Sequence, residues 1–353
     1  MDLDDGRLWG EGRPLLQRYG VVLLDLDGVV YLLGEPIDGA AKAIDAVRAN
    51  GGVPVFVTNN ASRRAAEVAR LLSGKGIEAG PGDVCTSAQT AAALLRDHCA
   101  PGSAVLVVGS TALAAEVAEV GLVPVDAPDG HEIVAVVQGY GPATGWRQLA
   151  DAVVVVRAGA WWVATNTDAT MPSPRGPLPG NGTMVAAVAT ALGRQPDVVA
   201  GKPAPAMLRR AVSAHPGREA LMVGDRWDTD IAGARAANLP GMLVLSGTTT
   251  PRQVLDIPAT ARPQYLAWTV AGITQSHPVV DHDATSESRF SCRDWTVRAE
   301  DSRLHLDGEG EALDALRTLA RAAWWTNDHV DGVSVRCDAE STAASAALRE
   351  LDI

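Results

Sequence analysis

The stretch 21-VVLLDLDGVV-30 joins a short apolar run to two aspartates and a glycine. Uninterrupted apolar runs are typical of strands buried on both faces of a parallel sheet, where charge is costly. Side chains two positions apart in a strand point to the same side. The pattern therefore predicts a buried strand whose end presents Asp25 and Asp27 on one side, followed by a turn at Gly28.

The length and composition indicate an ordinary globular protein with more than one domain. The chain has 353 residues, of which 47% are hydrophobic and 20% charged, and this length favours two to three domains. Its apolar runs are too short to cross a membrane, and its acidic N-terminus lacks the features of a signal peptide. Four cysteines lie far apart with no CxxC pair, so neither a disulfide framework nor a zinc site is indicated, and a cytoplasmic location is expected.

The charge distribution argues against nucleic acid as a partner. The net charge is −12, and residues 275–353 carry 16 acidic and 8 basic side chains, which places −8 of that charge there. A nucleic-acid binder needs a basic surface. We therefore expect a small-molecule partner, no nucleic acid and no membrane, and we leave open whether the chain forms a homo-oligomer.

Short apolar runs alternate with alanine-rich helical stretches along most of the chain. The runs VVLLDL (21–26), VPVFVT (53–58) and ALMVGD (220–225) are each followed by a helical pattern. This alternation predicts an α/β fold with a doubly wound parallel sheet and helices on both faces. In such sheets the ligand binds beyond the carboxyl ends of the strands, and all three runs end in polar candidates for a site.

The pattern also divides the chain into a core, an insertion and a tail. A second α/β pattern closes with the irregular segment TNTDATMPSPRGPLPGNG (165–182) before the chain returns to the core. QSHPVVDHDATSES is typical of a polar linker, and the residues after it suggest the order β-β-α-β-α. The predicted parts are core segments 1–99 and 181–274, an inserted α/β domain 100–180, a linker 275–288 and a small α+β domain 289–353.

Asp25 and Asp27 are candidates for a metal site. Two carboxylates held close together repel, and a divalent cation relieves that repulsion; oxygen ligands suit Mg²⁺. Gly28 allows a sharp turn that brings backbone N–H groups near an anion. The alternative is a plain strand end followed by a surface turn.

The segment VTNNAS (57–62) is a candidate for a phosphate site. Thr58 ends a strand, and Ser62 is placed to cap the next helix. The hydroxyl, the amide groups of Asn59 and Asn60 and the free backbone N–H groups suit a phosphate. An ordinary strand–loop–helix connection explains the same residues.

Two later segments add a cation and further acids. Lys202 in AGKPAP (200–205) is one of only three lysines, and a compact cation before a helix suits a phosphate, although Gly-Lys-Pro also suits a surface turn. In MVGDRWDTDIAGA, Asp225 ends an apolar strand. Asp228 and Asp230 lie at the entry to a helix, where acids commonly complement the helix dipole.

Taken in order, these motifs resemble the four-motif set of the haloacid dehalogenase (HAD) superfamily of phosphotransferases: DxDGxV, a strand ending in Thr, a Lys, and GDxxxxD. VTNNAS, GKP, GDRWDTDI and NTDxTxPxxxGxxPGNG are similar to the NagD-like phosphatases with a large C2-type cap. That group includes 4-nitrophenyl, phosphoglycolate and glycerol 3-phosphate phosphatases. The resemblance covers about residues 14–270 and implies a HAD-like core with an inserted α/β cap.

The resemblance implies a role for each acid. Asp25 is the expected nucleophile, forming an aspartyl-phosphate, and Asp27 the general acid and base. Mg²⁺ is the expected cofactor, held by Asp25, the backbone carbonyl of Asp27, and Asp225. Asp228 and Asp230 are expected to act on the metal through water or through its other ligands.

The resemblance also implies which residues bind the phosphate group and which select the substrate. Gly28, Thr58, Asn59, Asn60 and Lys202 are the expected phosphate-binding residues. In the cap, Asn166 and Asp168 are the candidates for substrate specificity, and the segment that holds them equally suits a plain connection between cap and core.

Several alternatives stay open at this point. Glycerol 3-phosphate is the first choice of substrate, with a place in glycerolipid metabolism, and phosphoglycolate, 4-nitrophenyl phosphate and nucleoside monophosphates are alternatives. A non-catalytic sensor of a phosphometabolite is the alternative of another class. Some relatives carry a C-terminal unit that resembles part of an N-acetyltransferase; residues 289–353 lack a glycine-rich pyrophosphate loop, which favours a structural or regulatory role.

Overall fold

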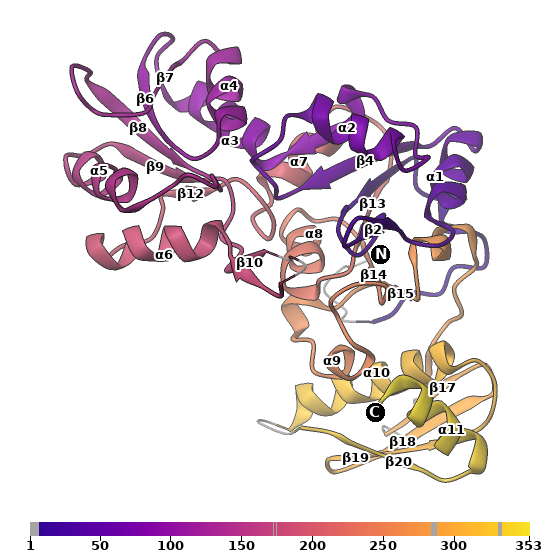
Figure 1. The fold of residues 1–353 in the computed structure, drawn as a ribbon. Coiled ribbons are helices and arrows are strands. Elements are labelled where there is room, and N and C mark those ends of the chain that lie inside the picture. The colour runs from indigo at the N-terminus through magenta and orange to yellow at the C-terminus, as the bar shows by residue number, and fades with distance from the viewer. Residues whose placement is uncertain (1–6, 172, 174, 284–287, 331–333) are drawn as a thin grey trace. The chain divides into compact units, whose positions relative to one another are not determined.

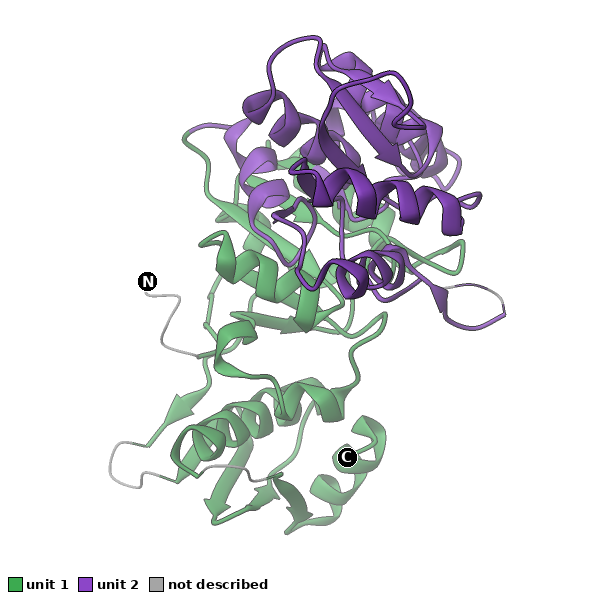
Figure 2. Ribbon diagram, turned by 90° about the vertical axis from the view of Figure 1, so that its left-hand side faces the viewer, with its two compact units in different colours: residues 1–54, 217–353 green, residues 55–216 purple. Residues whose placement is uncertain are grey.

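The computed structural model describes residues 7–171, 173, 175–283, 288–330 and 334–353. Residues 172 and 174 of the proline-rich segment and 284–287 of the predicted linker therefore lie outside the described residues. The chain forms two compact units, residues 1–54 with 217–353 and residues 55–216 (Figure 2). Each unit is described below by itself, and the predicted domain limits stay predictions.

The first unit contains a parallel sheet with strands in the order β15-β14-β13-β1. All four residues of β1 are buried, as the apolar run predicts, and Leu24 of β1 pairs in register with Val223 of β13. The α/β class is thereby confirmed. The elements of this part are η2 (Leu15–Gln17), β1 (Val21–Leu24), β2 (Tyr31–Leu32), β3 (Glu35–Pro36), α1 (Ala40–Ala49), β13 (Ala220–Gly224), a π-helical turn η4 (Trp227–Ile231), α8 (Ala232–Ala236), β14 (Gly241–Val244), α9 (Pro251–Leu255), η5 (Ala259–Ala261), β15 (Tyr265–Ala267) and η6 (Val270–Thr274).

A second sheet in the same unit has the strand order β16-β17-β18-β19-β20. It is antiparallel except for the pair β19 and β20. The predicted order β-β-α-β-α is wrong by one strand. The loops after β17 and β18 contain Arg293 and Asp301 in left-handed conformations, with φ of 52° and 53°, and they lack the glycine that marks a tight hairpin turn in a sequence. The elements are β16 (Asp281–His282), β17 (Arg289–Cys292), β18 (Trp295–Glu300), β19 (Arg303–Asp307), α10 (Ala312–His329), β20 (Arg336–Ala339) and α11 (Thr342–Leu351).

The two sheets of the first unit share one apolar core. A single cluster of buried side chains runs from Leu243 and Val254 to Phe290, Trp295 and Trp324. The indole N–H of Trp324 donates to the carbonyl of Val254 at 2.9 Å. The C-terminal segment therefore packs against the parallel sheet's own helices through a hydrophobic interface.

The second unit is built on a parallel sheet in the order β12-β9-β8-β6-β7. Strand side chains alternate between two faces: Val105 and Val137 pack with α3 and α4, and Leu106 and Val136 pack with α5 and α6. These two pairs of helices cover the two faces of the sheet (Figure 1). Strand β4 crosses the unit boundary. The elements are β4 (Val53–Thr58), α2 (Ala65–Ser73), η3 (Pro81–Asp83), β5 (Val84–Thr86), α3 (Ser87–His98), β6 (Ala104–Val108), α4 (Thr111–Glu119), β7 (Val123–Val125), β8 (Ile133–Gln138), α5 (Trp146–Arg157), β9 (Trp161–Ala164), β10 (Thr170–Met171), β11 (Leu178–Pro179), α6 (Asn181–Leu192), β12 (Val198–Val199) and α7 (Ala206–Ser213).

In the described part of the chain, every helix is too short or too polar to cross a lipid bilayer.

Candidate active site

Three carboxylates converge in the first unit. One oxygen each of Asp25, Asp225 and Asp230 lies within 4.8 Å of the others. Asp25 directly follows β1, and its backbone N–H donates to the carbonyl of Val223 at 3.0 Å, which continues the pairing with β13. Parallel pairing thus brings the ends of two buried strands, and the acids after them, to the same edge of the sheet.

Two glycines allow the loops to approach Asp225. Gly28 has a φ of +82°, and a Cβ at this position would lie 2.4 Å from Oδ2 of Asp225; a Cβ on Gly247 would lie 2.1 Å from the same oxygen. The backbone N–H of Thr248 donates to Oδ2 of Asp225 at 2.6 Å. The predicted turn at Gly28 is present, and it lets the chain pass directly beside the acid.

The π-helical turn η4 separates Asp230 from Asp228. Asp230 is 1% exposed, and its Oδ2 accepts a hydrogen bond from the backbone N–H of Arg226 at 3.1 Å. Asp228 is exposed, and its two oxygens accept from the guanidinium of Arg226 at 3.1 and 2.8 Å. The turn therefore directs one acid into the cluster and the other to the surface; π-helical turns of this kind are frequent at functional sites.

Asp27 lies outside this group of three carboxylates. Its side chain is exposed, and its backbone forms an isolated bridge with Tyr31. An exposed carboxyl group exchanges protons with solvent readily, whereas the buried Asp225, 2% exposed, does not have that access.

The carboxylate cluster fits a divalent cation. Like charges this close repel one another, and Asp225 and Asp230 are both buried. A hard divalent ion prefers an oxygen donor set of this kind. Asp25, Asp225 and Asp230 are therefore the side chains suited to hold Mg²⁺.

Four of the five predicted phosphate-binding residues, Thr58, Asn59, Asn60 and Lys202, lie in the second unit, whereas Gly28 lies in the first. Lys202 is 2% exposed, and its Nζ donates to the carbonyl of Val57 at 3.4 Å. Thr58 Oγ1 accepts from the backbone N–H of Asn60 at 3.1 Å. The end of β4 and the GKP loop are thus neighbours, although 143 residues separate Asn59 from Lys202.

Ser62 does not cap the following helix, contrary to expectation. Its backbone N–H and its hydroxyl both donate to Oδ1 of Asn60, each at 2.8 Å. Helix α2 begins three residues later, at Ala65. There the Glu67 carboxylate accepts from the backbone N–H of Arg64 at 2.9 Å, so an acid in the first turn replaces the predicted serine cap.

The side chain of Asn59 joins two segments. Its Nδ2 donates to the carbonyl of Lys202 at 2.9 Å and to Oδ2 of Asp168 at 3.0 Å, and its Oδ1 accepts from the backbone N–H of Lys202 at 2.8 Å. Its own carbonyl accepts from Asn166 Nδ2 at 2.7 Å and from Ser87 Oγ at 2.6 Å.

Asn166 and Asp168 lie beside these residues. Oδ1 of Asn166 accepts from the backbone N–H of Asp168 at 3.2 Å. Asn181, at the start of α6, donates from Nδ2 to the carbonyl of Asn166 at 2.7 Å. The structure therefore brings Asn59, Asn166, Asp168 and Lys202 together, and it adds Asn181 as a supporting residue that sequence reasoning missed. The PGNG sequence at a helix start was the available signal.

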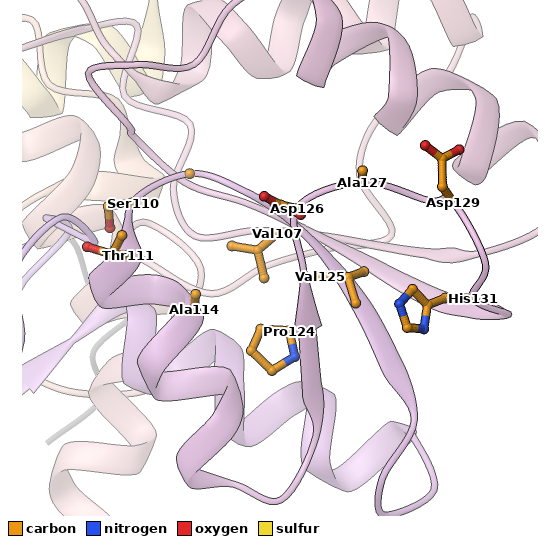
Figure 3. A pocket seen from close by; sticks show the side chains of 11 residues that line it. Val107, Ser110, Thr111, Ala114, Pro124, Val125, Asp126, Ala127, Asp129 and His131 are labelled. Atoms are coloured by element: carbon orange, nitrogen blue, oxygen red, sulfur yellow. The ribbon is translucent and has the colours of Figure 1, made fainter.

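A surface pocket of about 390 Å³ lies at the start of α4 and after β7 (Figure 3). It is lined in part by Ser110, Asp126, Asp129 and His131, and it contains none of the predicted site residues. The Ser110 hydroxyl donates to the carbonyl of Ala61 and accepts from the backbone N–H of Leu113. This pocket is separate from the contacts that hold Asn59 and Lys202.

Comparisons with protein families agree with the motif pattern. Residues 22–123 match the haloacid dehalogenase-like hydrolase family, and residues 199–273 match a HAD-hydrolase-like family. Residues 292–353 match the GCN5-related N-acetyltransferase like domain.

Individual relatives are phosphatases. D-glycerol 3-phosphate phosphatase of Mycobacterium tuberculosis is 48% identical over 267 residues, which are 74% of this chain and 73% of the relative. The crystal structure of glycerol phosphate phosphatase from that organism, in complex with magnesium, matches with a TM-score of 0.85 and 41% identity over 96% of this chain and 98% of that one. p-Nitrophenyl phosphatase from Archaeoglobus fulgidus matches with a TM-score of 0.67 and 26% identity over 73% and 98% of the two chains. The expected HAD-like fold, with its C-terminal addition, is confirmed.

Proposed function

The chain belongs to the haloacid dehalogenase-like hydrolases, and from this we propose that it is a Mg²⁺-dependent phosphatase of small phosphate monoesters. The observation that carries the proposal is the convergence of Asp25, Asp225 and Asp230 at the ends of two buried strands. Family membership supplies the reaction class, and the carboxylate cluster supplies a place for the metal. The related glycerol phosphate phosphatase was crystallised with magnesium.

Asp25 and Asp27 divide the chemistry between them in this proposal. A carboxylate oxygen of Asp25 attacks phosphorus, the bond from phosphorus to the ester oxygen breaks, and the carboxyl group of Asp27 gives its proton to the departing alcohol. Water then attacks the phosphorus of the aspartyl-phosphate and gives a proton back to Asp27, and inorganic phosphate leaves. The exposure of Asp27 supports its role in proton exchange.

The other proposed residues neutralise the charge of the phosphoryl group and hold it in position. Asp25, Asp225, Asp230 and the backbone carbonyl of Asp27 would hold Mg²⁺, which would supply positive charge against the phosphoryl group. In the second unit, the hydroxyl of Thr58, the backbone of the segment Asn59–Asn60 and Lys202 bind the phosphoryl oxygens. Gly28, whose own N–H donates to the carbonyl of Tyr31 at 2.8 Å, lets the chain turn beside Asp225. Because phosphoryl transfer depends mainly on positioning and charge stabilisation, each group is needed at a fixed place.

Glycerol 3-phosphate is the proposed substrate. The support is a relative that is 48% identical and named for that activity, and a structural match that extends over 96% of the chain, C-terminal segment included. Phosphoglycolate, 4-nitrophenyl phosphate and nucleoside monophosphates are the alternatives. We also propose a cytoplasmic location and a place in glycerolipid metabolism; four free cysteines are typical of a reducing compartment.

The test is phosphate release from a panel of these esters by the purified full chain, with Mg²⁺ and with EDTA. We expect the highest kcat/KM on glycerol 3-phosphate and loss of turnover when the metal is removed. Preference for another ester would correct the substrate alone. Saturable binding of an ester without phosphate release would show that the chain is a phosphometabolite sensor and not an enzyme.

A further inference from the structure

Asn59 occupies the point where three segments of the second unit meet. The end of β4 carries Asn59 itself, the segment after β9 carries Asp168, and the GKP loop carries Lys202. The amide of Asn59 uses both of its N–H bonds and its oxygen on the other two segments. We propose that Asn59 is a positioning residue that couples Lys202 to the carboxylate of Asp168, so that the phosphate-binding lysine and the cap acid are set in place together. The inference rests on the proposed function.

The contact with Lys202 fixes its backbone at two points. The Asn59 side chain accepts from the Lys202 N–H at 2.8 Å and donates to the Lys202 carbonyl at 2.9 Å. Two such bonds to one residue restrict both its position and the rotation of its peptide groups. Because Lys202 is buried and its Nζ lies 3.4 Å from the Val57 carbonyl, a backbone shift would move the ammonium group directly.

Gly201 makes this close approach possible. A Cβ on residue 201 would lie 2.5 Å from Oδ1 of Asn59 and 2.7 Å from the carbonyl of Thr165. The backbone N–H of Gly201 donates to that same Thr165 carbonyl at 2.8 Å. Any larger residue would separate the GKP loop from Asn59, so the glycine serves the contact between them.

The contact with Asp168 joins the cap segment to the same amide. The bond from Asn59 Nδ2 to Asp168 Oδ2 is 3.0 Å, and hydrogen bonds to an ionised group are about twice as strong as neutral ones. Asn166 adds a second bond from this segment, to the Asn59 carbonyl. The Asp168 backbone is held in turn by Asn166 and by Gly182. A change in the position of Asp168 is therefore transmitted through Asn59 to Lys202.

The test compares Asn59→Asp with the double variant Asn59→Asp/Asp168→Asn. The single change keeps the size of the side chain, removes the donor and places two carboxylates about 3 Å apart, as Asn59 and Asp168 now are. We expect a roughly 10- to 100-fold loss of kcat/KM at pH 7, smaller at low pH because two close carboxylates share a proton. The double variant restores an amide–carboxylate pair in reverse, and we expect it to recover at least about fivefold of that loss.

Lys202→Ala separates positioning from a general loss of structure. If Asn59 acts through the lysine, Asn59→Asp lowers kcat by less than about threefold in the Lys202→Ala background. Asn50→Asp is the matched control, because Asn50 donates to the Leu16 carbonyl at the exposed end of α1; we expect unchanged kcat/KM. Thermal unfolding of every variant reports whether it is folded.

Independent losses would overturn the inference. The inference fails if Asn59→Asp lowers kcat by the same factor in the Lys202→Ala background as in the unaltered chain. It also fails if adding Asp168→Asn to a folded Asn59→Asp variant recovers none of the lost kcat/KM. If Asn59→Asp does not fold, Asp168→Ala carries the test. We expect Asp168→Ala to raise KM and also to lower kcat. In the Lys202→Ala background, Asp168→Ala should no longer lower kcat. If Asp168→Ala changes KM alone, the coupling is contradicted. Absence of phosphate release by the unaltered chain would instead reject the proposed function.

Discussion

The first unit holds two groups of buried charges that are built in opposite ways. At the strand ends, Asp25, Asp225 and Asp230 gather like charges. On the buried side of α10, Asp314 forms ion pairs with Arg317 and with Arg293, and Arg317 also donates to the carbonyl of Leu266 at 2.6 Å.

The contrast between like charges and paired charges distinguishes a metal site from a structural contact. A buried ion pair with satisfied hydrogen bonds is tolerated inside a folded chain and holds two elements in register. A buried group of like charges destabilises the fold unless a cation enters it. We therefore expect changes at the strand ends to alter turnover and metal binding with little loss of stability. Changes on the buried side of α10 should lower stability with little effect on turnover.

The largest expected effect is on turnover at the strand ends. Asp25→Asn removes the proposed nucleophile, and we expect phosphate release to fall by about 10⁴-fold or more. Because the change also removes one of three like charges, the melting temperature should stay the same or rise. Asp45→Asn, on the exposed face of α1, is the matched control and should keep full activity. Phosphate release and thermal unfolding measure both quantities; undiminished turnover by Asp25→Asn would falsify the mechanism.

The next effect is on stability, at the buried side of α10. Trp324 is 0% exposed, and Trp324→Ala leaves a large cavity and an unpaired Val254 carbonyl, so we expect a loss of about 3–5 kcal/mol. Trp146→Ala, at a position that is 83% exposed, should change stability by less than about 0.5 kcal/mol. Denaturant unfolding of both variants is the measurement. Equal effects of the two tryptophans would mean that the C-terminal segment does not share the core.

His277 shows a third way to bury an ionisable group, which is to keep it neutral. Burial lowers the pKa of His277 from 6.5 to about 4, because the apolar surroundings disfavour the imidazolium ion. The unfolded chain therefore binds the proton more readily between pH 6.5 and 4, and stability falls as the pH falls through that range. By linkage the loss is about 3 kcal/mol. Denaturant unfolding at pH 7 and pH 4 should show it in the unaltered chain and not in His277→Gln.

The strand ends were predictable because their signal is local. An apolar run followed by DLDG or GD specifies a buried strand and the acids at its end, and parallel pairing is the common way to cover such strands. The resemblance implies an indirect role for Asp230, whereas the π-helical turn η4, which has no local sequence signal, directs its carboxylate into the cluster.

Contacts between distant segments could not be predicted from local patterns. The partners of Asn59 lie 109 and 143 residues further along the chain, and its amide suits a phosphate as well as it suits a peptide group. Likewise, the polar stretch 275–288 predicts a linker before a small C-terminal domain. The hydrogen bonds of Trp324 with Val254 and with Arg262 connect α10 to α9 and to the chain before β15, and no local pattern indicates them. Only the folded chain shows which of several possible partners a polar or aromatic side chain meets.

The smallest expected effect distinguishes the two acids of η4. Asp230 shares the cluster and is 1% exposed, whereas Asp228 pairs with Arg226 at the surface. We expect Asp230→Asn to raise the Mg²⁺ concentration for half-maximal activity by about 10- to 100-fold. An exposed ion pair contributes little, so Asp228→Asn should raise that concentration by no more than about threefold. Mg²⁺ titrations of activity and of thermal stability measure both shifts. Equal shifts would mean that the turn does not select one acid for the metal, and the contrast between converging and paired charges would then not extend to η4.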